Sequence, residues 1–220
     1  MTDASEPTTL DRVPTPRGEL VLRRSGDDFE IISNGVFLMD TSDGTSERLL
    51  VDAAVERCPT SGSRLLIGGL GVGFSLVRAV GHKRLDAIDV VEISPSIVDW
   101  HARYLGHITA PAMADPRVRI IEADILKWLG RAESQYDAIC LDTDNGPNWL
   151  VHEANASLYA QPGLQLAAAC LRRNGVLAVW SAQRDDAYEQ RLRDAFTAVE
   201  VLEVPRDRGV PDVIYLGRVA

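Results

Sequence analysis

The stretch that decides the fold reads Leu65-Leu66-Ile67-Gly68-Gly69-Leu70-Gly71-Val72-Gly73-Phe74. Its apolar start predicts a buried strand, and its glycines let the chain turn sharply where a ligand approaches the backbone. A dinucleotide site needs a glycine three places after Gly71, and Phe74 stands there. The spacing Gly69-x-Gly71-x-Gly73 instead favours a nucleoside with an amino-acid tail. A purely structural turn and another nucleotide are the alternatives.

Downstream of this turn, short apolar runs alternate with helical segments. The predicted strands cover 64–68, 87–93, 118–123, 136–142 and 176–181, and the predicted helices cover 74–80, 95–104, 125–129 and 162–172. This alternation predicts an α/β fold, a doubly wound, mainly parallel, Rossmann-like sheet whose ligands bind beyond the carboxyl ends of the strands. A helix over 185–196 and strands over 199–204 and 212–218 predict a C-terminal antiparallel hairpin.

Upstream of the turn, the pattern is different. Residues 1–17 contain Pro14, Pro16 and scattered Ser and Thr, and are expected to form a flexible tail. Residues 18–45 hold three short strand-like runs separated by turns such as Asn34-Gly35, which predicts a small β-meander. A helix is expected over 46–57, so that residues 46–220 form the α/β domain.

Composition narrows the function. The 220 residues carry a net charge of −9, which argues against a nucleic-acid partner and is compatible with a cationic substrate. The three cysteines lack paired metal-ligand spacing, so we expect no metal site and a reducing cytoplasmic location. No apolar run approaches the ~20 residues of a membrane span, and the start of the chain has no apolar core of a secretory signal.

Acidic residues stand at the ends of three predicted strands. Glu92 follows Gly73 by 19 residues, and a carboxylate there can accept from both ribose hydroxyls, although it can also be a solvated strand-end acid. Asp124 is placed to take the adenine amine, to cap the helix over 125–129, or both. Asp142 is the best candidate for orienting or deprotonating a nucleophile, with an Asx-type turn as the alternative.

The residues after Asp142 complete the expected site. Asp144 is a second catalytic candidate, and the loop that follows supplies a substrate pocket of Asn145, Trp149, His152 and Tyr159. His152 as a general base is a minority hypothesis beside an ordinary loop histidine. The expected nucleoside-binding set is Gly69, Gly71, Gly73, Glu92, Ile93, Asp124, Ile125 and Asp142.

From residue 18 to residue 217 the chain resembles the spermidine synthase-like branch of the class I S-adenosylmethionine-dependent transferases. The resemblance lies in 36–40, 67–73, Val91-Glu92-Ile93, 115–118, Glu122-Ala123-Asp124, 136–142, Leu158-Tyr159, 174–177 and 214–217. It implies that Glu92 binds the ribose, Asp124 contacts adenine and Asp142 is the catalytic aspartate. It also implies a homodimer and an S-adenosylmethionine-binding domain over residues 46–220.

Two departures from that branch bear on the reaction. Aminopropyltransferases carry an aspartate within the glycine turn, where residues 67–73 contain no acid, and another three residues after the catalytic one, where Asn145 stands. The sequence therefore predicts a methyltransferase that uses S-adenosylmethionine and acts on a small, amine-containing molecule. The alternatives are a polyamine aminopropyltransferase that uses decarboxylated S-adenosylmethionine, a non-catalytic nucleoside-binding or scaffold protein, and a dinucleotide oxidoreductase.

Overall fold

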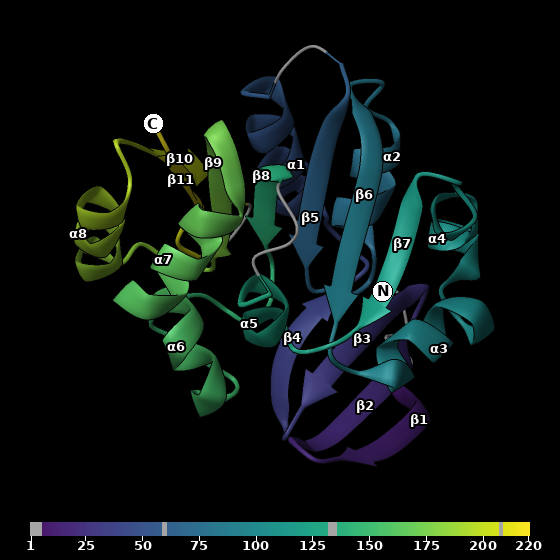
Figure 1. Cartoon of the computed structure of the whole chain (residues 1–220). Helices are drawn as coiled ribbons and strands as arrows, with labels where there is room; N and C mark the ends of the chain where they lie inside the picture. Colours follow the sequence, from purple (N-terminus) through teal and green to yellow (C-terminus); the bar gives the residue numbers. More distant parts are fainter. Residues whose placement is uncertain (1–5, 59–60, 132–135, 207–208) are drawn as a thin grey trace.

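The computed structural model describes residues 6–58, 61–131, 136–206 and 209–220, which form two sheets (Figure 1). The smaller sheet is antiparallel and contains β1 (Thr8–Thr15), β2 (Gly18–Ser25), β3 (Asp28–Ser33) and β4 (Val36–Asp40). The larger sheet has the order β10-β11-β9-β8-β5-β6-β7. Its strands are β5 (Ser63–Gly68), β6 (Leu85–Glu92), β7 (Val118–Glu122), β8 (Tyr136–Leu141), β9 (Leu171–Ser181), β10 (Ala198–Val204) and β11 (Asp212–Arg218).

The order of the larger sheet confirms the predicted architecture. Strands β5 to β9 pair in parallel, while β11 runs antiparallel to β9 and β10 antiparallel to β11. The chain places β6 and β7 on one side of β5 and then returns to place β8 and β9 on the other side. This is the topological switch point at which doubly wound sheets bind their ligands.

Helices cover both faces of this sheet (Figure 1). One face carries α1 (Thr45–Glu56), α2 (Phe74–Val80), α3 (Pro95–Arg103) and α4 (Gly106–Met113). The other carries α5 (Ile125–Leu129), α7 (Gln161–Cys170) and α8 (Asp186–Ala195), and the short η1 (Glu153–Asn155) and α6 (Ala156–Tyr159) precede α7.

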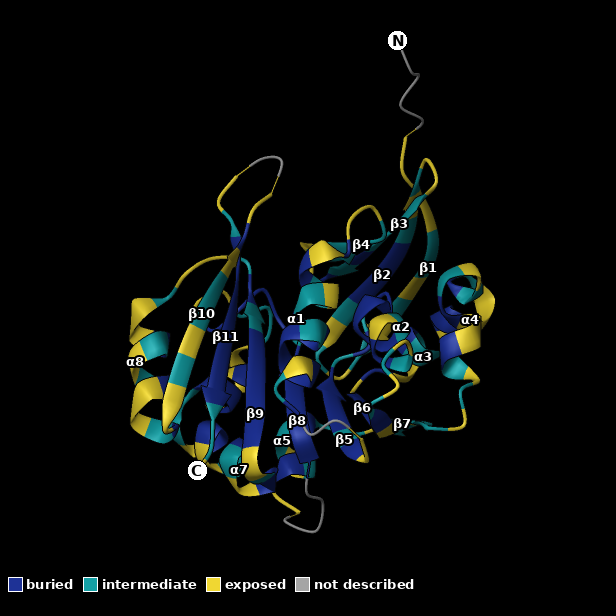
Figure 2. Cartoon of the chain, turned by 90° about the horizontal axis from the view of Figure 1, so that it is seen from above, coloured by how far each residue is buried: buried dark blue, intermediate teal, exposed yellow. Residues whose placement is uncertain are grey.

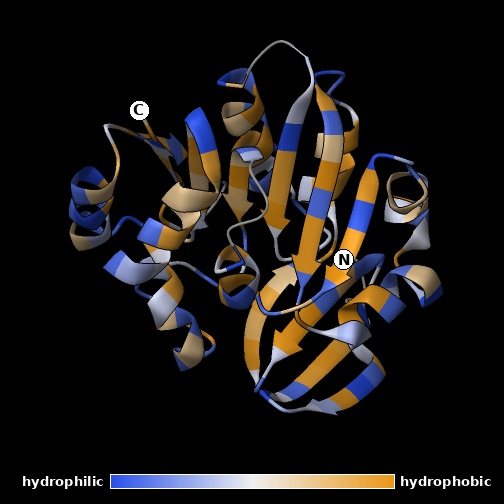
Figure 3. Cartoon of the chain, in the orientation of Figure 1, coloured by the Kyte–Doolittle hydropathy of each residue, from blue (hydrophilic) through white to orange (hydrophobic). Residues whose placement is uncertain are grey.

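The central strands are buried on both faces, as a parallel sheet requires (Figure 2). In β5, Leu65 and Ile67 pack into the core beneath α1, whereas Leu66 packs into the core beneath α7. Hydrophobic residues concentrate on the strands, and α8 at the margin is mostly hydrophilic (Figure 3). This burial fixes the strand ends, and hence the residues that follow them, in one rigid frame.

The smaller sheet lies beyond the carboxyl ends of the parallel strands (Figure 1). Its first strand corrects the prediction of a flexible tail, because Thr8–Thr15 pairs with β2 along its whole length. Residues 1–5 of the predicted tail lie outside the described residues. The sheet packs into the core of α1 through residues such as Leu22 and Ile31, both fully buried.

Other elements also differ from the prediction, among them the short η1 and α6, which were not predicted. Helix α4 was not predicted at all, and α7 ends at Cys170, so that β9 begins at Leu171, five residues before the predicted strand. Asn174, just beyond the predicted end of that helix, has a φ of +62° and lies within the β9 segment. No helix in the described part of the chain is long and apolar enough to cross a membrane.

Candidate active site

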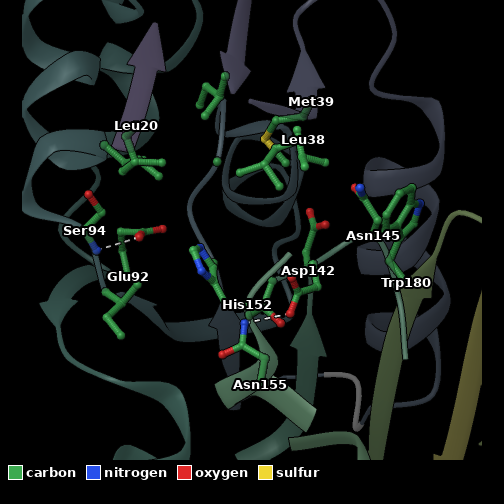
Figure 4. A pocket seen from close by; sticks show the side chains of 18 of the residues that line it. Leu20, Leu38, Met39, Glu92, Ser94, Asp142, Asn145, His152, Asn155 and Trp180 are labelled. Carbon is green, nitrogen blue, oxygen red and sulfur yellow. Dashed lines mark hydrogen bonds between the residues drawn. The ribbon is translucent and has the colours of Figure 1, made fainter. Parts of the chain in front are cut away.

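A cavity of about 820 Å³ lies between the smaller sheet and the carboxyl ends of β5, β6, β7 and β8. The smaller sheet contributes residues such as Leu20 of β2 and Met39 of β4, and the larger sheet contributes strand-end residues such as Glu92 and Asp142 (Figure 4). The turn before β2 and the glycine turn also line the cavity. Such a volume lies within the range of small-molecule sites. The edge of the sheet at which the sequence predicted a ligand is therefore one wall of a cavity, and the smaller sheet covers that cavity.

At Gly69 and Gly71 the glycine turn has no room for a side chain. A Cβ on Gly69 would lie 2.1 Å from the carbonyl oxygen of Asp142, and a Cβ on Gly71 would lie 2.3 Å from the sulfur of Met39. Both glycines have positive φ, +94° and +52°. The glycine turn therefore packs tightly against the residue after β8 at Gly69 and against β4 at Gly71. Both glycines lie on the cavity wall.

Replacing Gly69 by alanine should lower the free energy of unfolding by about 2–4 kcal/mol, because it adds a backbone clash to an unfavourable φ. Nucleoside binding should weaken with it, as the turn moves away from Asp142. Gly26→Ala is the matched control, since Gly26 also has positive φ, +63°, but open space around its Cβ position. Denaturant unfolding of both variants measures the difference, and equal losses would contradict the proposed clash.

Glu92 lies at the end of β6 with its carboxylate fixed by the backbone. Its Oε2 accepts from the amide of Leu70 at 2.9 Å and its Oε1 from the amide of Ser94 at 2.8 Å. Burial raises the pKa of Glu92, and these amides oppose the shift. The neighbouring Ser94 hydroxyl is buried and has no hydrogen-bond partner within the described residues. A diol between these two side chains would satisfy both.

Asp124 caps α5, as one of its two predicted roles required. Its Oδ1 accepts from the amides of Leu126 at 2.9 Å and Lys127 at 3.3 Å. Its Oδ2 accepts from Arg17 at 2.7 Å, a residue that the sequence placed in the tail. Any contact of Asp124 with adenine therefore shares this carboxylate with a guanidinium. The predicted neighbours Ile93 and Ile125 also lie on the cavity wall.

Asp142 lies at the end of β8 and faces two further acids, Glu47 of α1 and Asp212 of β11. Ser75 donates to Oδ2 of Asp142 at 3.3 Å, and Ser46 donates to Oε2 of Glu47 at 3.1 Å. All three acids line the cavity. We call Glu47, Asp142 and Asp212 the carboxylate cluster.

All three acids of the carboxylate cluster have a raised pKa. Burial raises the pKa of Glu47 to about 7, and the charge of Asp142 adds to the effect. Burial also raises the pKa of Asp142 to about 6, with Asp212 adding to it against the Ser75 hydrogen bond. The pKa of Asp212 is raised, chiefly by burial. Such shifts mark groups that can exchange protons or bind cations.

Four of the predicted residues after Asp142 lie on the same cavity wall, namely Asp144, Asn145, Trp149 and His152. The polar groups of Asp144 and Asn145 are held by hydrogen bonds. Asp144 accepts from the amide of Val151 at 2.8 Å and from Nδ2 of Asn155 at 2.6 Å. Asn145 donates to the carbonyl of Phe37 at 3.4 Å, and Trp149 is half exposed at the rim.

His152 contacts Ser33 of β3 through Nε2 at 3.3 Å, and burial lowers its pKa. It is thus a partly buried contact between the loop and the smaller sheet, and it lines the cavity.

Two predicted site residues do not reach the cavity. Tyr159 is only 2% exposed and packs in the core beneath α7, where its hydroxyl pairs with Thr143 at 2.9 Å, so the prediction that it walls the pocket was wrong. Gly73 lies behind the turn, where a Cβ would be 2.4 Å from Thr109 of α4. Its role is to let α2 begin beside α4 rather than to face a ligand.

The sequence missed several residues that line this cavity, including Ser94, Asn155, Glu47, Asp212, Arg17 and Met39. Glu47 and Asp212 belong to elements remote from the glycine turn, and Arg17 and Met39 come from the smaller sheet. Met39 has a partial signal, because the apolar run of β4 was predicted, but nothing in its spacing points to the turn.

The charge of the cavity wall is strongly negative. Eight acids and two arginines line it among the described residues, and each arginine is paired, Arg17 with Asp124 and Arg206 with Asp212. Within the described ranges, no three His, Cys, Asp or Glu side chains are arranged to hold a metal ion. The excess of acids on the wall favours a cationic ligand.

The chain matches one protein family over most of its length. The family model of the spermine/spermidine synthase domain matches residues 46–193. Among curated proteins, polyamine aminopropyltransferase 2 of Ralstonia nicotianae is 25% identical over 170 residues, which cover 76% of this chain and 32% of that protein. Putrescine N-methyltransferase 2 of Nicotiana tabacum is 29% identical over 132 residues, which cover 59% of this chain and 35% of that protein. The chain thus spans about a third of the length of these relatives.

Solved structures share the fold. A spermidine synthase in complex with the transition-state analogue AdoDATO superposes with a TM-score of 0.82 at 15% identity, covering 97% of this chain and 74% of that one. Spermidine synthase from Thermotoga maritima gives a TM-score of 0.78 at the same identity, covering 97% of this chain and 73% of that one.

Proposed function

Because the chain belongs to the spermine/spermidine synthase domain family, we propose that it is a transferase that moves an aminopropyl group from decarboxylated S-adenosylmethionine to a small amine. This ligand supplies a carbon that its sulfonium has already activated for displacement. What remains for the protein is to bind the nucleoside, place the amine and take its proton.

The observation that carries this proposal is the negative charge of the carboxylate cluster, in which Glu47 and Asp212 lie near Asp142. S-adenosylmethionine has a carboxylate on its tail, and the decarboxylated form has only an amine. The carboxylate cluster repels the tail carboxylate of S-adenosylmethionine and attracts the tail amine of the decarboxylated form. Both arginines on the cavity wall are already paired with acids, so neither is free to bind a tail carboxylate. The geometry therefore supports aminopropyl transfer over the methyl transfer that the sequence favoured.

Each end of the cavity suits one part of the reaction. Glu92 and Ser94 offer an acceptor and a free hydroxyl to a ribose diol, and Ile93 and Ile125 offer apolar contact to a base. Asp142 offers a carboxylate whose pKa of about 6 suits it to accept a proton near neutral pH. The attacking amine would lose that proton as its nitrogen bonds to the activated carbon.

Methyl transfer is the second candidate. The Nicotiana tabacum relative is named a putrescine N-methyltransferase, and residues 67–73, which form the glycine turn, contain no acid. The same cavity would then hold S-adenosylmethionine, and its tail carboxylate would need a partner that the described wall does not offer free.

Calorimetry and product analysis separate the two candidates. We expect decarboxylated S-adenosylmethionine to bind at least about tenfold more tightly than S-adenosylmethionine, because the two differ by one buried charge. Incubation with putrescine should yield a product heavier by an aminopropyl group. A preference for S-adenosylmethionine together with a product heavier by a methyl group would reverse the proposal.

The proposal also includes the predicted homodimer and cytoplasmic location. Light scattering of the purified chain measures its mass in solution, and a mass near 24.1 kDa would contradict the homodimer.

A further inference from the structure

Arg17 occupies the tight turn between β1 and β2, at the edge of the cavity. Several hydrogen bonds fix this turn. Thr15 donates from its hydroxyl to the carbonyl of Gly18 at 2.7 Å, and Asn34 donates to the carbonyl of Arg17 at 3.1 Å. Gly18 has a φ of +110°, which other residues rarely adopt. The backbone that carries Arg17 is therefore held in one conformation.

The guanidinium of Arg17 bridges two loops of the larger domain. Nη2 donates to Oδ2 of Asp124 at 2.7 Å, and Nη1 donates to Oδ1 of Asn155 at 2.9 Å. Asp124 lies at the end of the cavity near Glu92, whereas Asn155 lies beside Asp144. One side chain thus contacts both ends of the site.

Asn155 transmits the position of Arg17 to Asp144. A guanidinium can only donate, so the oxygen of the Asn155 amide faces Arg17 and its NH₂ group faces Asp144, to which it donates at 2.6 Å. Asn155 is 8% exposed, and the other oxygen of Asp144 accepts from the amide of Val151. Without Arg17, the amide of Asn155 loses one of the two contacts that fix its orientation and keeps only the one to Asp144.

We propose that Arg17 is a positioning residue, which orients Asp144 through Asn155 for binding the acceptor amine. This inference rests on the proposed function, since it assigns the acceptor to Asp144. It also gives the smaller sheet a part in the site, because its turn supplies the group that orders the loop containing Asp144.

The same contacts predict opposite effects at the two ends of the cavity. In Arg17→Ala, the acceptor should bind about tenfold more weakly, because Asp144 loses its fixed orientation. The nucleoside should bind as well as before or more tightly, because Oδ2 of Asp124 becomes free. A variant with a generally damaged fold would weaken both ligands.

Calorimetry tests this without depending on turnover. Putrescine is titrated into the protein saturated with methylthioadenosine, the nucleoside that aminopropyl transfer leaves, and methylthioadenosine is titrated into the free protein. Arg24→Ala is the matched control, because Arg24 lies at the opposite end of β2 from Arg17. Arg24 pairs there with the exposed Asp27. Thermal melting checks that each variant is folded.

A double-mutant cycle gives the second readout. Asn155→Ala should weaken putrescine binding by about as much as Arg17→Ala, and the double variant should lose little more than either single one. Unchanged putrescine affinity in Arg17→Ala, additive losses, or equal weakening of both ligands would overturn the inference. If the wild-type protein transfers aminopropyl groups and Arg17→Ala behaves like Arg24→Ala, the inference fails while the proposed function stands. If the wild-type protein binds no putrescine, the inference fails, and the proposed function is decided separately by its donor preference and its product.

Discussion

Asp142→Asn is expected to lower kcat by about 10²–10⁴-fold and to change the affinity for methylthioadenosine by less than about threefold. Asparagine has nearly the same shape and can still accept from Ser75, but it cannot take a proton from an amine. The nucleoside is expected to depend on the glycine turn, Glu92 and Ser94, which this change leaves in place. Turnover and binding should therefore separate.

Single-turnover kinetics and calorimetry on the same preparation measure this separation. Asp86→Asn is the control, because Asp86 is exposed near the start of β6, away from the carboxyl ends that form the cavity. A non-catalytic nucleoside-binding protein would bind methylthioadenosine and show no turnover in the wild type or either variant. Full turnover in Asp142→Asn would remove Asp142 from the reaction.

The features that the sequence predicted well depend on neighbouring residues. The helices over 74–80 and 125–129 and the strand over 212–218 lie within their predicted bounds, because each is a short apolar segment between clear breaks. The three strand ends that carry Glu92, Asp124 and Asp142 meet at one edge, because parallel strands share their carboxyl ends.

The features that it missed depend on tertiary pairing. Strand β1 carries Pro14 and few apolar residues, so its local pattern resembles a tail, and it is an edge strand whose one neighbour in the sheet is β2. Helix α4 begins at Gly106 and contains Pro111, and both residues argue against a helix when read locally. Packing against α2 and α3 overrides that preference.

The carboxylate cluster was also invisible to local reasoning. Glu47 and Asp212 are 165 positions apart in the chain, and each is an ordinary acid near the start of its element. Only the pairing of β11 with β9, and the packing of α1 against both β8 and β11, bring them to Asp142. The cluster supplies acids to a site whose glycine turn has none.

The carboxylate cluster predicts that stability and activity respond to pH in opposite directions. The pKa of Glu47 is raised from its ordinary value of 4.5 to about 7, and the pKa of Asp142 is raised from 3.8 to about 6. The folded state therefore holds more protons than the unfolded state between about pH 4 and pH 7, and stability from these groups falls as pH rises through that window. Binding of a cationic amine needs their ionised forms, so kcat/KM should rise between about pH 6 and pH 7.

Glu47→Gln tests this opposition, because it removes one buried charge and keeps the shape of the side chain. At pH 8 the variant should gain on the order of 1–2 kcal/mol of stability and lose about tenfold in kcat/KM for the amine. Its rise in kcat/KM should move to lower pH, because the ionisation of Glu47 near pH 7 is then absent and only that of Asp142 near pH 6 remains. Glu56→Gln is the control, because Glu56 is exposed on the same helix. This variant should change neither the stability nor kcat/KM. If Glu47→Gln left both the pH profile and the stability of the protein unchanged, Glu47 would be an ordinary solvated acid, and the charge that selects a decarboxylated ligand would have to come from Asp142 and Asp212 alone.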